Sequence, residues 1–286
     1  MNDHLIISTC ADDTVRIYTI LTTATVEEAR QVHDTWPTAT AALGRILTGT
    51  LIMGVMSDTL RRLTVQFDGN GPLGKIIAVS NTRGTVKGCL DQPHVDLELN
   101  ALGKFDVAGA VGSGTLTVIK DYGLKNPYNG IVPIQCGEIG QDFAYYFTNS
   151  EQTPSAVGVG VLINPDGRVR VAGGFIAQLL PGYSDQTLHQ LEAKLAKIPA
   201  VTSLLDHGIS PEELARQLAL DSGDVKILEQ LPVKYQCDCS RDRFRGPLLS
   251  LGQEELDDII KEYGKIEVKC QFCNKTYCFQ NTALDD

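Results

Sequence analysis

Two kinds of hydrophobic pattern alternate over the first 180 or so residues. Apolar side chains at every second position, as at Val15, Ile17 and Leu21, are typical of a half-buried strand. Similar strand patterns, separated by glycine-rich turns, recur at residues 63–67, 76–79, 95–99, 116–118, 156–163 and 169–172. The sequence Asn164-Pro-Asp-Gly167 joins the last two of these segments and predicts a hairpin.

Helical spacing appears between these strand patterns. Thr25 and Glu28 form a capping-box pattern, which predicts a helix that ends before Trp36-Pro37. Residues 38–56 are rich in alanine, leucine and small side chains, so we expect a buried helix packed closely against a sheet. A short helix is predicted over residues 138–149. The mixture predicts an α+β fold, with residues 1–183 forming one N-terminal core domain.

The pattern changes after Pro181-Gly182. An amphipathic helix is predicted by Leu188, Leu191 and Leu195. The sequence Ser210-Pro-Glu-Glu213 combines an N-cap, a proline at the first helical position and a capping box, and it predicts a second helix. Residues 221–231 are polar and have little to bury. We therefore interpret residues 184–232 as a helical linker of low intrinsic stability.

Composition and charge exclude several classes of protein. Hydrophobic residues make up 43% of the chain and charged residues 21%, which is the balance of a globular protein. The formal net charge of -10 argues against binding to nucleic acid or to anionic lipid through bulk electrostatics. No apolar run is long enough for a membrane span, and the first residues lack the basic start of a signal peptide. We expect a cytoplasmic protein with no nucleic-acid or membrane partner.

The cysteines carry the candidate chemistry. In a reducing compartment, clustered cysteines indicate metal or redox chemistry rather than a permanent disulfide framework. Cys237 and Cys239 form one close pair, and Cys270 and Cys273 form another. Four thiolates in two pairs are the ligands that tetrahedral zinc prefers, so we predict one zinc ion per chain, held by these four residues. A helix over 253–262 and a strand over 266–268 complete a predicted C-terminal zinc-binding domain, residues 233–286.

Such a zinc site could be purely structural, or it could act as a redox switch. Zinc binding contributes about 10–16 kcal/mol to the folding of small thiolate sites. A hydrophobic core of this size supplies only about 3–5 kcal/mol. Oxidation of the thiolates would remove the ligands and with them the larger contribution. The hypothesis is that the C-terminal domain then unfolds and that the weak linker beside it follows.

These motifs resemble those of a known family. The segments Cys237-Asp-Cys239-Ser-Arg-Asp-Arg243 and Cys270-Gln-Phe-Cys273-Asn-Lys-Thr-Tyr277 resemble the zinc signature of the redox-regulated thirty-three-kilodalton heat-shock chaperones. The resemblance extends through the large domain, where the following segments stand in the family's order: Gly71-Pro-Leu-Gly74, Ser150-Glu-Gln-Thr-Pro-Ser155 and Ala172-Gly-Gly174. It departs from many relatives at Ser57-Asp58 and at Cys89, which leaves local details of the large domain open.

The resemblance implies an ATP-independent holdase chaperone and not an enzyme. The reduced, zinc-bound form would be inactive, with Cys237, Cys239, Cys270 and Cys273 as zinc ligands. Oxidants together with unfolding conditions would form the disulfides Cys237–Cys239 and Cys270–Cys273, release zinc and activate the binding of unfolding client proteins. The resemblance also implies a homodimer in the oxidised state.

Two other functions remain open at this point. Arg241, Arg243 and Arg245 could belong to a zinc ribbon that binds nucleic acid, although acidic side chains outnumber basic ones in this tail. Cys270-Gln-Phe-Cys273 could serve a thiol-disulfide oxidoreductase, which would require a βαβ context with the active pair at the start of a helix.

The remaining signals favour ordinary structural roles. Gly69-Asn-Gly71-Pro-Leu-Gly74 spells a dinucleotide-binding pattern, but a strand rather than a helix follows it, so we interpret it as a turn. Three cysteines (Cys10, Cys89 and Cys136) are expected to be small packing residues. Cys278 could compete as a ligand, but four ligands are already present.

Overall fold

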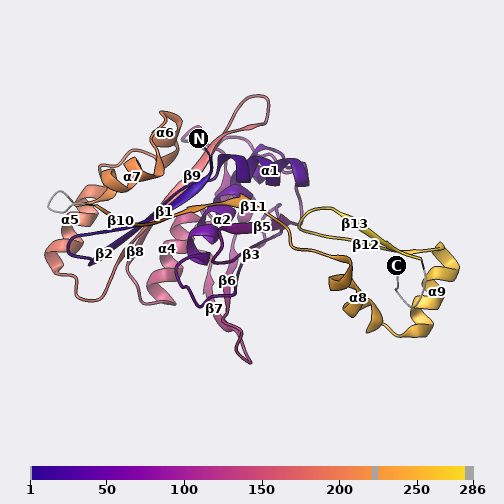
Figure 1. Cartoon of the computed structure of the whole chain (residues 1–286). Helices are drawn as coiled ribbons and strands as arrows, with labels where there is room; N and C mark the ends of the chain where they lie inside the picture. The colour runs from indigo at the N-terminus through magenta and orange to yellow at the C-terminus, as the bar shows by residue number, and fades with distance from the viewer. Residues whose placement is uncertain (1, 221–224, 281–286) are drawn as a thin grey trace. The chain divides into compact units, whose positions relative to one another are not determined.

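The computed structural model describes residues 2–220 and 225–280, and the chain divides into two compact units, Met1–Tyr235 and Gln236–Asp286 (Figure 1). Those parts of the predicted ranges that fall on residues 1, 221–224 and 281–286 lie outside the described residues. The helices of the first unit are α1 (Thr23–His33), α2 (Pro37–Gly54), α3 (Val107–Val111), α4 (Gly140–Asn149), α5 (Asp185–Leu195), α6 (Val201–Asp206) and α7 (Pro211–Leu218).

The strands of the first unit form two sheets. The first sheet is antiparallel throughout, in the order β10 (Lys226–Pro232), β1 (His4–Cys10), β2 (Val15–Leu21), β9 (Val169–Leu179), β8 (Ser155–Ile163). The second has the order β11 (Lys234–Tyr235), β5 (Thr85–Leu90), β4 (Lys75–Ser80), β3 (Arg62–Gly69), β6 (Gly114–Asp121), β7 (Tyr128–Pro133), and its β11–β5 pair is parallel. The predicted hairpin at Asn164–Gly167 joins β8 to β9, and Gly69–Gly74 forms the predicted turn between β3 and β4.

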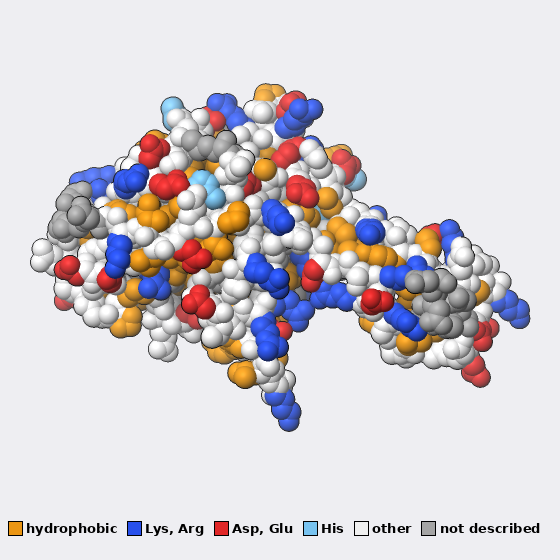
Figure 2. Space-filling view, in the orientation of Figure 1, with side chains coloured by type: hydrophobic (Ala, Val, Ile, Leu, Met, Phe, Trp, Pro, Cys, Tyr) orange, Lys and Arg blue, Asp and Glu red, His pale blue; other side chains and the backbone are white. Residues whose placement is uncertain are grey.

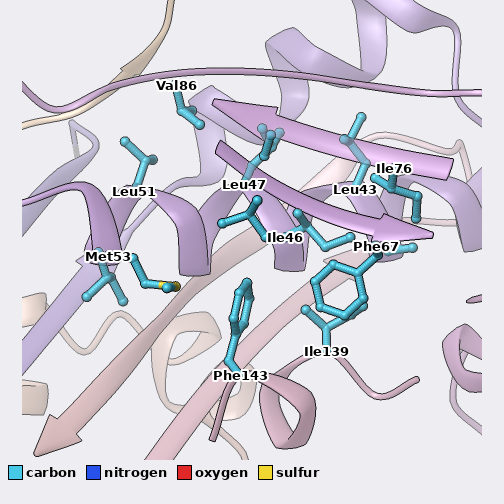
Figure 3. Close-up of a cluster of buried hydrophobic side chains, with 14 of the residues drawn as sticks. Leu43, Ile46, Leu47, Leu51, Met53, Phe67, Ile76, Val86, Ile139 and Phe143 are labelled. Carbon is cyan, nitrogen blue, oxygen red and sulfur yellow. The ribbon is translucent and has the colours of Figure 1, made fainter. Parts of the chain in front are cut away.

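Helix α2 is the centre of the first unit. It is buried along almost its whole length and contacts strands of both sheets, so the predicted buried helix packs on two sheets rather than one. Figure 3 shows Leu43, Ile46 and Leu47 of α2 among Phe67 and Phe143. Gly49 is required where α2 passes α4, since a Cβ atom there would lie 2.4 Å from the ring of Phe143. The mixed architecture matches the predicted α+β fold.

Side chains of α5, α6 and α7 contribute to a second apolar cluster, and α6 and α7 contact the five-stranded sheet on β1, β2, β8 and β9. Leu214 and Leu218 of α7 are completely buried in this cluster. The capping box predicted at Ser210 is present, because Ser210 Oγ accepts the Glu213 N–H and the Glu213 carboxylate accepts the Ser210 N–H. The predicted linker segment therefore packs its helices on the sheet and continues into β10, whose first five residues are exposed.

The second unit contains α8 (Arg241–Leu249), α9 (Gln253–Tyr263), β12 (Ile266–Lys269) and β13 (Thr276–Phe279). The two strands pair as an antiparallel hairpin. Its buried core is small and consists of Leu256, Ile266, Tyr277 and Phe279. Helix α9 and strand β12 agree with the predictions from the sequence, whereas α8 was not predicted.

Two local predictions in the first unit are wrong. Residues 95–99 form no strand, because the backbone there bonds instead to the start of α2, where Ala39 N–H donates to the Val95 carbonyl and Leu97 N–H donates to Thr38 Oγ1. Helix α1 begins at Thr23 without a capping box.

The carboxylate of Asp3, from outside helix α1, accepts the N–H groups of Ala24 and Thr25 and so replaces the predicted local cap. Strands β10 and β11 were not predicted either, since the apolar residues of β10 do not alternate with polar ones and none of them is buried. None of the described helices is long and apolar enough to span a membrane.

Candidate metal centre

Cys270 and Cys273 lie at the tip of the β12–β13 hairpin. The loop is closed by two backbone hydrogen bonds, from Cys270 N–H to the Lys275 carbonyl at 2.9 Å and from Asn274 N–H to the Cys270 carbonyl at 2.9 Å. Asn274 adopts a positive φ of 57°, a left-handed conformation that asparagine tolerates better than most residues. This tight loop directs both sulfur atoms of the pair to the same side.

Cys237 and Cys239 lie in the irregular segment that precedes α8. Ser240 ends this segment as the N-cap of α8, where its hydroxyl accepts the Arg243 N–H. The guanidinium of Arg243 also holds the residue between the two cysteines, forming a 2.6 Å ion pair with the Asp238 carboxylate and donating to the Asp238 carbonyl. The start of the helix thus fixes the short segment that carries the first pair of thiols.

The structure brings these four cysteines together. Their sulfur atoms all lie within 4.8 Å of one another. The shortest contacts cross between the pairs, 3.6 Å from Cys237 to Cys270 and 3.3 Å from Cys239 to Cys273. A tetrahedron of sulfur ligands about 2.3 Å from a central zinc ion has edges of about 3.8 Å. The size of the cluster and its all-thiol donor set therefore fit one zinc ion.

Three thiols of the cluster (Cys237, Cys239 and Cys273) differ in acidity. Burial raises the pKa of Cys237 far above its ordinary value, and the hydrogen bonds it shares with the other thiols raise it further. Burial also raises the pKa of Cys273. Burial opposes ionisation of Cys239 as well, but hydrogen bonds from the Tyr277 hydroxyl and from the neighbouring thiols lower its pKa to about 7. Of these three thiols, Cys239 therefore has the lowest pKa.

The other cysteines lie outside this cluster, and none of the eight, all of which are described, forms a disulfide. Cys10 is buried, as predicted for a packing residue. Cys136 is exposed, so the packing interpretation is wrong there, and its thiol donates to the side chain of Gln141 at 2.9 Å. Cys278 is exposed on β13 and contacts Glu267, because alternate residues of this strand point away from the core.

The arrangement is poorly suited to the two alternative functions. The guanidinium of Arg241 lies 4.3 Å from the ring centre of Phe279 and donates to the Cys278 carbonyl, and Arg243 holds Asp238. These two arginines stabilise the second unit itself. Over the first unit, the view in Figure 2 shows acidic and basic side chains interspersed, whereas a nucleic-acid surface would need a basic patch. Cys270 follows strand β12 in a hairpin loop, not at the start of a helix as a thiol-disulfide oxidoreductase requires.

Comparison with known proteins gives a consistent picture over the whole chain. The model of the Hsp33 protein family matches residues 3–280. The "33 kDa chaperonin" of Geobacillus kaustophilus is 50% identical over 286 residues, covering 100% of this chain and 97% of the relative. The protein of the same name from Listeria monocytogenes is 44% identical over 287 residues, covering 100% of this chain and 98% of the relative.

A solved structure is also similar. The crystal structure of the 33 kDa chaperonin (heat shock protein 33 homolog) from Thermotoga maritima superimposes with a TM-score of 0.90 at 38% sequence identity. The match covers 99% of this chain and 97% of that one.

Proposed function

The chain belongs to the Hsp33 family of redox-regulated chaperones, which are not enzymes, and on that premise we propose that its four clustered thiols switch it between an inactive reduced form and an active holdase. The observation that carries this proposal is the approach of four sulfur atoms to within 4.8 Å of one another, in a unit whose apolar core has only four buried side chains among the described residues. The thiols that hold the unit together are then also the groups that an oxidant attacks.

In the reduced form, Cys237, Cys239, Cys270 and Cys273 would hold one zinc ion as thiolates. Zinc supplies a folding free energy of about 10–16 kcal/mol in sites of this kind. The apolar core of so small a unit supplies only about 3–5 kcal/mol. We therefore infer that the second unit is folded only while its thiolates remain available as ligands.

In the oxidised form, we propose the disulfides Cys237–Cys239 and Cys270–Cys273. For each pair, two thiolates give two electrons to one molecule of peroxide, the O–O bond breaks, an S–S bond forms, and two protons are taken up to give two molecules of water. Two peroxides oxidise all four thiolates, which leaves no charged sulfur to hold a metal. The unit then loses its larger source of stability and unfolds.

Unfolding of residues 233–286 would loosen the preceding segment, residues 184–232, which we propose as a functional linker. Its helices cover an apolar cluster on the five-stranded sheet, so their movement would uncover apolar surface for unfolding client proteins. We further propose that the oxidised chain forms a homodimer and that the protein works in the cytoplasm, where thiols are reduced in the absence of stress.

Peroxide treatment at heat-shock temperature is expected to convert the protein into a holdase. The oxidised chain should suppress light scattering by a heat-labile client at equimolar concentration and without ATP, whereas the reduced zinc-loaded chain should have little effect. If a fully oxidised, zinc-free sample leaves client aggregation unchanged, the proposed function is wrong.

Peptide mapping of the same sample provides the control. Cleavage after Lys234 and Arg241 and after Lys269 and Lys275 releases each cysteine pair on its own peptide, 235–241 and 270–275. The proposed disulfides leave these peptides separate and each lighter by two hydrogen atoms. Cross-linked peptides would instead show that the disulfides follow the shortest sulfur contacts, Cys237 to Cys270 and Cys239 to Cys273.

A further inference from the structure

Tyr277 is an aromatic residue of the second unit whose hydroxyl contacts the thiol cluster. It lies on β13, only 8% exposed, and its ring packs on Phe244 with ring centres 5.1 Å apart. Its hydroxyl oxygen lies 3.2 Å from Cys239 Sγ and 3.0 Å from the Cys239 carbonyl oxygen. The ring belongs to the core of the unit, and the hydroxyl is held against one of the four sulfur atoms.

The hydroxyl has one proton and two acceptors within reach. A tyrosine O–H donates a single hydrogen bond, so it can serve the sulfur atom or the carbonyl oxygen of Cys239 fully, but not both. A thiolate is a charged acceptor and makes the stronger hydrogen bond. A disulfide sulfur carries no charge and accepts weakly, so the proton would then turn to the carbonyl. The hydroxyl thus interacts more favourably with the thiolate than with the oxidised sulfur.

The packing of the Tyr277 ring holds the hydroxyl beside Cys239, whichever of the two acceptors it uses. Contact with Phe244 and its place in the hairpin fix the ring in the core, and strand pairing opposite Val268 fixes the backbone. A donor held by packing in this way is preorganised, because little side-chain freedom is lost when the hydrogen bond forms. Groups that orient metal ligands by such hydrogen bonds commonly affect metal affinity as well.

We propose that Tyr277 is a positioning residue whose hydroxyl donates to the Cys239 thiolate, orients it towards the metal and thereby strengthens the hold of the thiol cluster on its ion. This inference rests on the proposed zinc site and extends it to a fifth side chain. Since Tyr277 acts through Cys239, removing its hydroxyl should alter the metal–sulfur bond as well as the stability of the unit.

The test compares the Tyr277→Phe variant with the natural sequence in the full-length chain, loaded with zinc or with cobalt(II). Zinc should be lost to a competing chelator at about 10-fold lower chelator concentration, as for other groups that hydrogen-bond to metal ligands. In the cobalt form, the thiolate-to-metal charge-transfer band should move to lower energy, because a sulfur that has lost a hydrogen bond gives up electron density more easily. Tyr263→Phe, at a tyrosine of the same unit that is 67% exposed, is the matched control and should change neither value.

Two further variants separate positioning from packing. Phe244→Leu loosens the contact with the ring but keeps the hydroxyl and the strand pairing of Tyr277, so it should lower the melting temperature and move the band less than Tyr277→Phe does. Replacing Tyr277 by 3-fluorotyrosine keeps the ring and strengthens the donor, so the band should move to higher energy even if Tyr277→Phe fails to fold.

If the charge-transfer band moves neither in Tyr277→Phe nor with 3-fluorotyrosine at position 277, the proposal is overturned. The hydroxyl would then have only a structural role, as a donor to the Cys239 carbonyl. Equal zinc retention in Tyr277→Phe and the natural chain would overturn it as well. Neither readout involves a client protein, so failure here is distinct from failure of the holdase function.

Discussion

Cys270→Ser is expected to leave residues 236–280 unfolded in the reduced protein while the first unit keeps its fold. Cys270 is the most buried of the four thiols, with 4% of its surface exposed. A serine hydroxyl does not ionise near neutral pH and cannot replace a thiolate ligand. Loss of tight zinc binding would remove most of about 10–16 kcal/mol, far more than the small core can replace.

Hydrogen exchange followed by mass spectrometry measures this directly, together with the zinc content of the same sample. Amides of β12 and β13 should exchange as in an unfolded chain, and those of α2 and β2 should stay protected. Cys278→Ser is the matched control, because Cys278 is exposed and lies outside the thiol cluster, and it should retain both zinc and protection. Retention of one zinc and of native protection by Cys270→Ser would show that the four thiols do not act together.

Leu218→Ala is expected to make the reduced, zinc-loaded protein protect clients at temperatures where the natural chain is inactive. Leu218 is completely buried on α7, among apolar side chains that include Ile17 and Leu214. Truncating a buried leucine to alanine costs about 2–5 kcal/mol, since it removes buried apolar surface and leaves a cavity. The helices that cover the sheet would then loosen without oxidation. In the natural protein, we propose that unfolding of the second unit causes this loosening.

Thermal unfolding and client light scattering, recorded on the reduced variant, check this expectation. Leu124→Ala is the control, because Leu124 is 74% exposed and its truncation should change neither measurement. If the Leu218→Ala protein melts at a lower temperature but does not protect clients in its reduced form, loosening of the linker helices does not create the client-binding surface.

The thiol cluster could be predicted from the sequence because both pairs are local. The two cysteines of each pair are so close in sequence that they must lie near each other in space. The site therefore needed only one long-range contact, between the Cys237–Cys239 segment and the Cys270–Cys273 loop. Tyr277 ends the second segment that resembles the family's zinc signature, but the sequence did not indicate its hydrogen bond to Cys239. Its hydroxyl meets Cys239 only because β13 pairs with β12 and aligns the two segments, and no spacing in the sequence indicates which core aromatic does so.

The same distinction explains the fold predictions. Helix α7 and the β8–β9 hairpin were predicted because their caps and turn residues are adjacent in sequence. The start of α1 was missed because Asp3, which caps it, comes from an earlier part of the chain. Strand β10 was missed because its pairing with β1 rests on backbone hydrogen bonds, with almost no buried side chains to produce a pattern.

The most direct test of the switch follows zinc release, free thiols and hydrogen exchange together during one peroxide time course. The amides of residues 236–280 are expected to lose protection in step with the release of one zinc per chain and the loss of four thiols, and reductant with zinc should restore all three. If all four thiols are oxidised and the zinc is gone while β12 and β13 remain protected, the thiolates do not hold this unit together and the account is wrong.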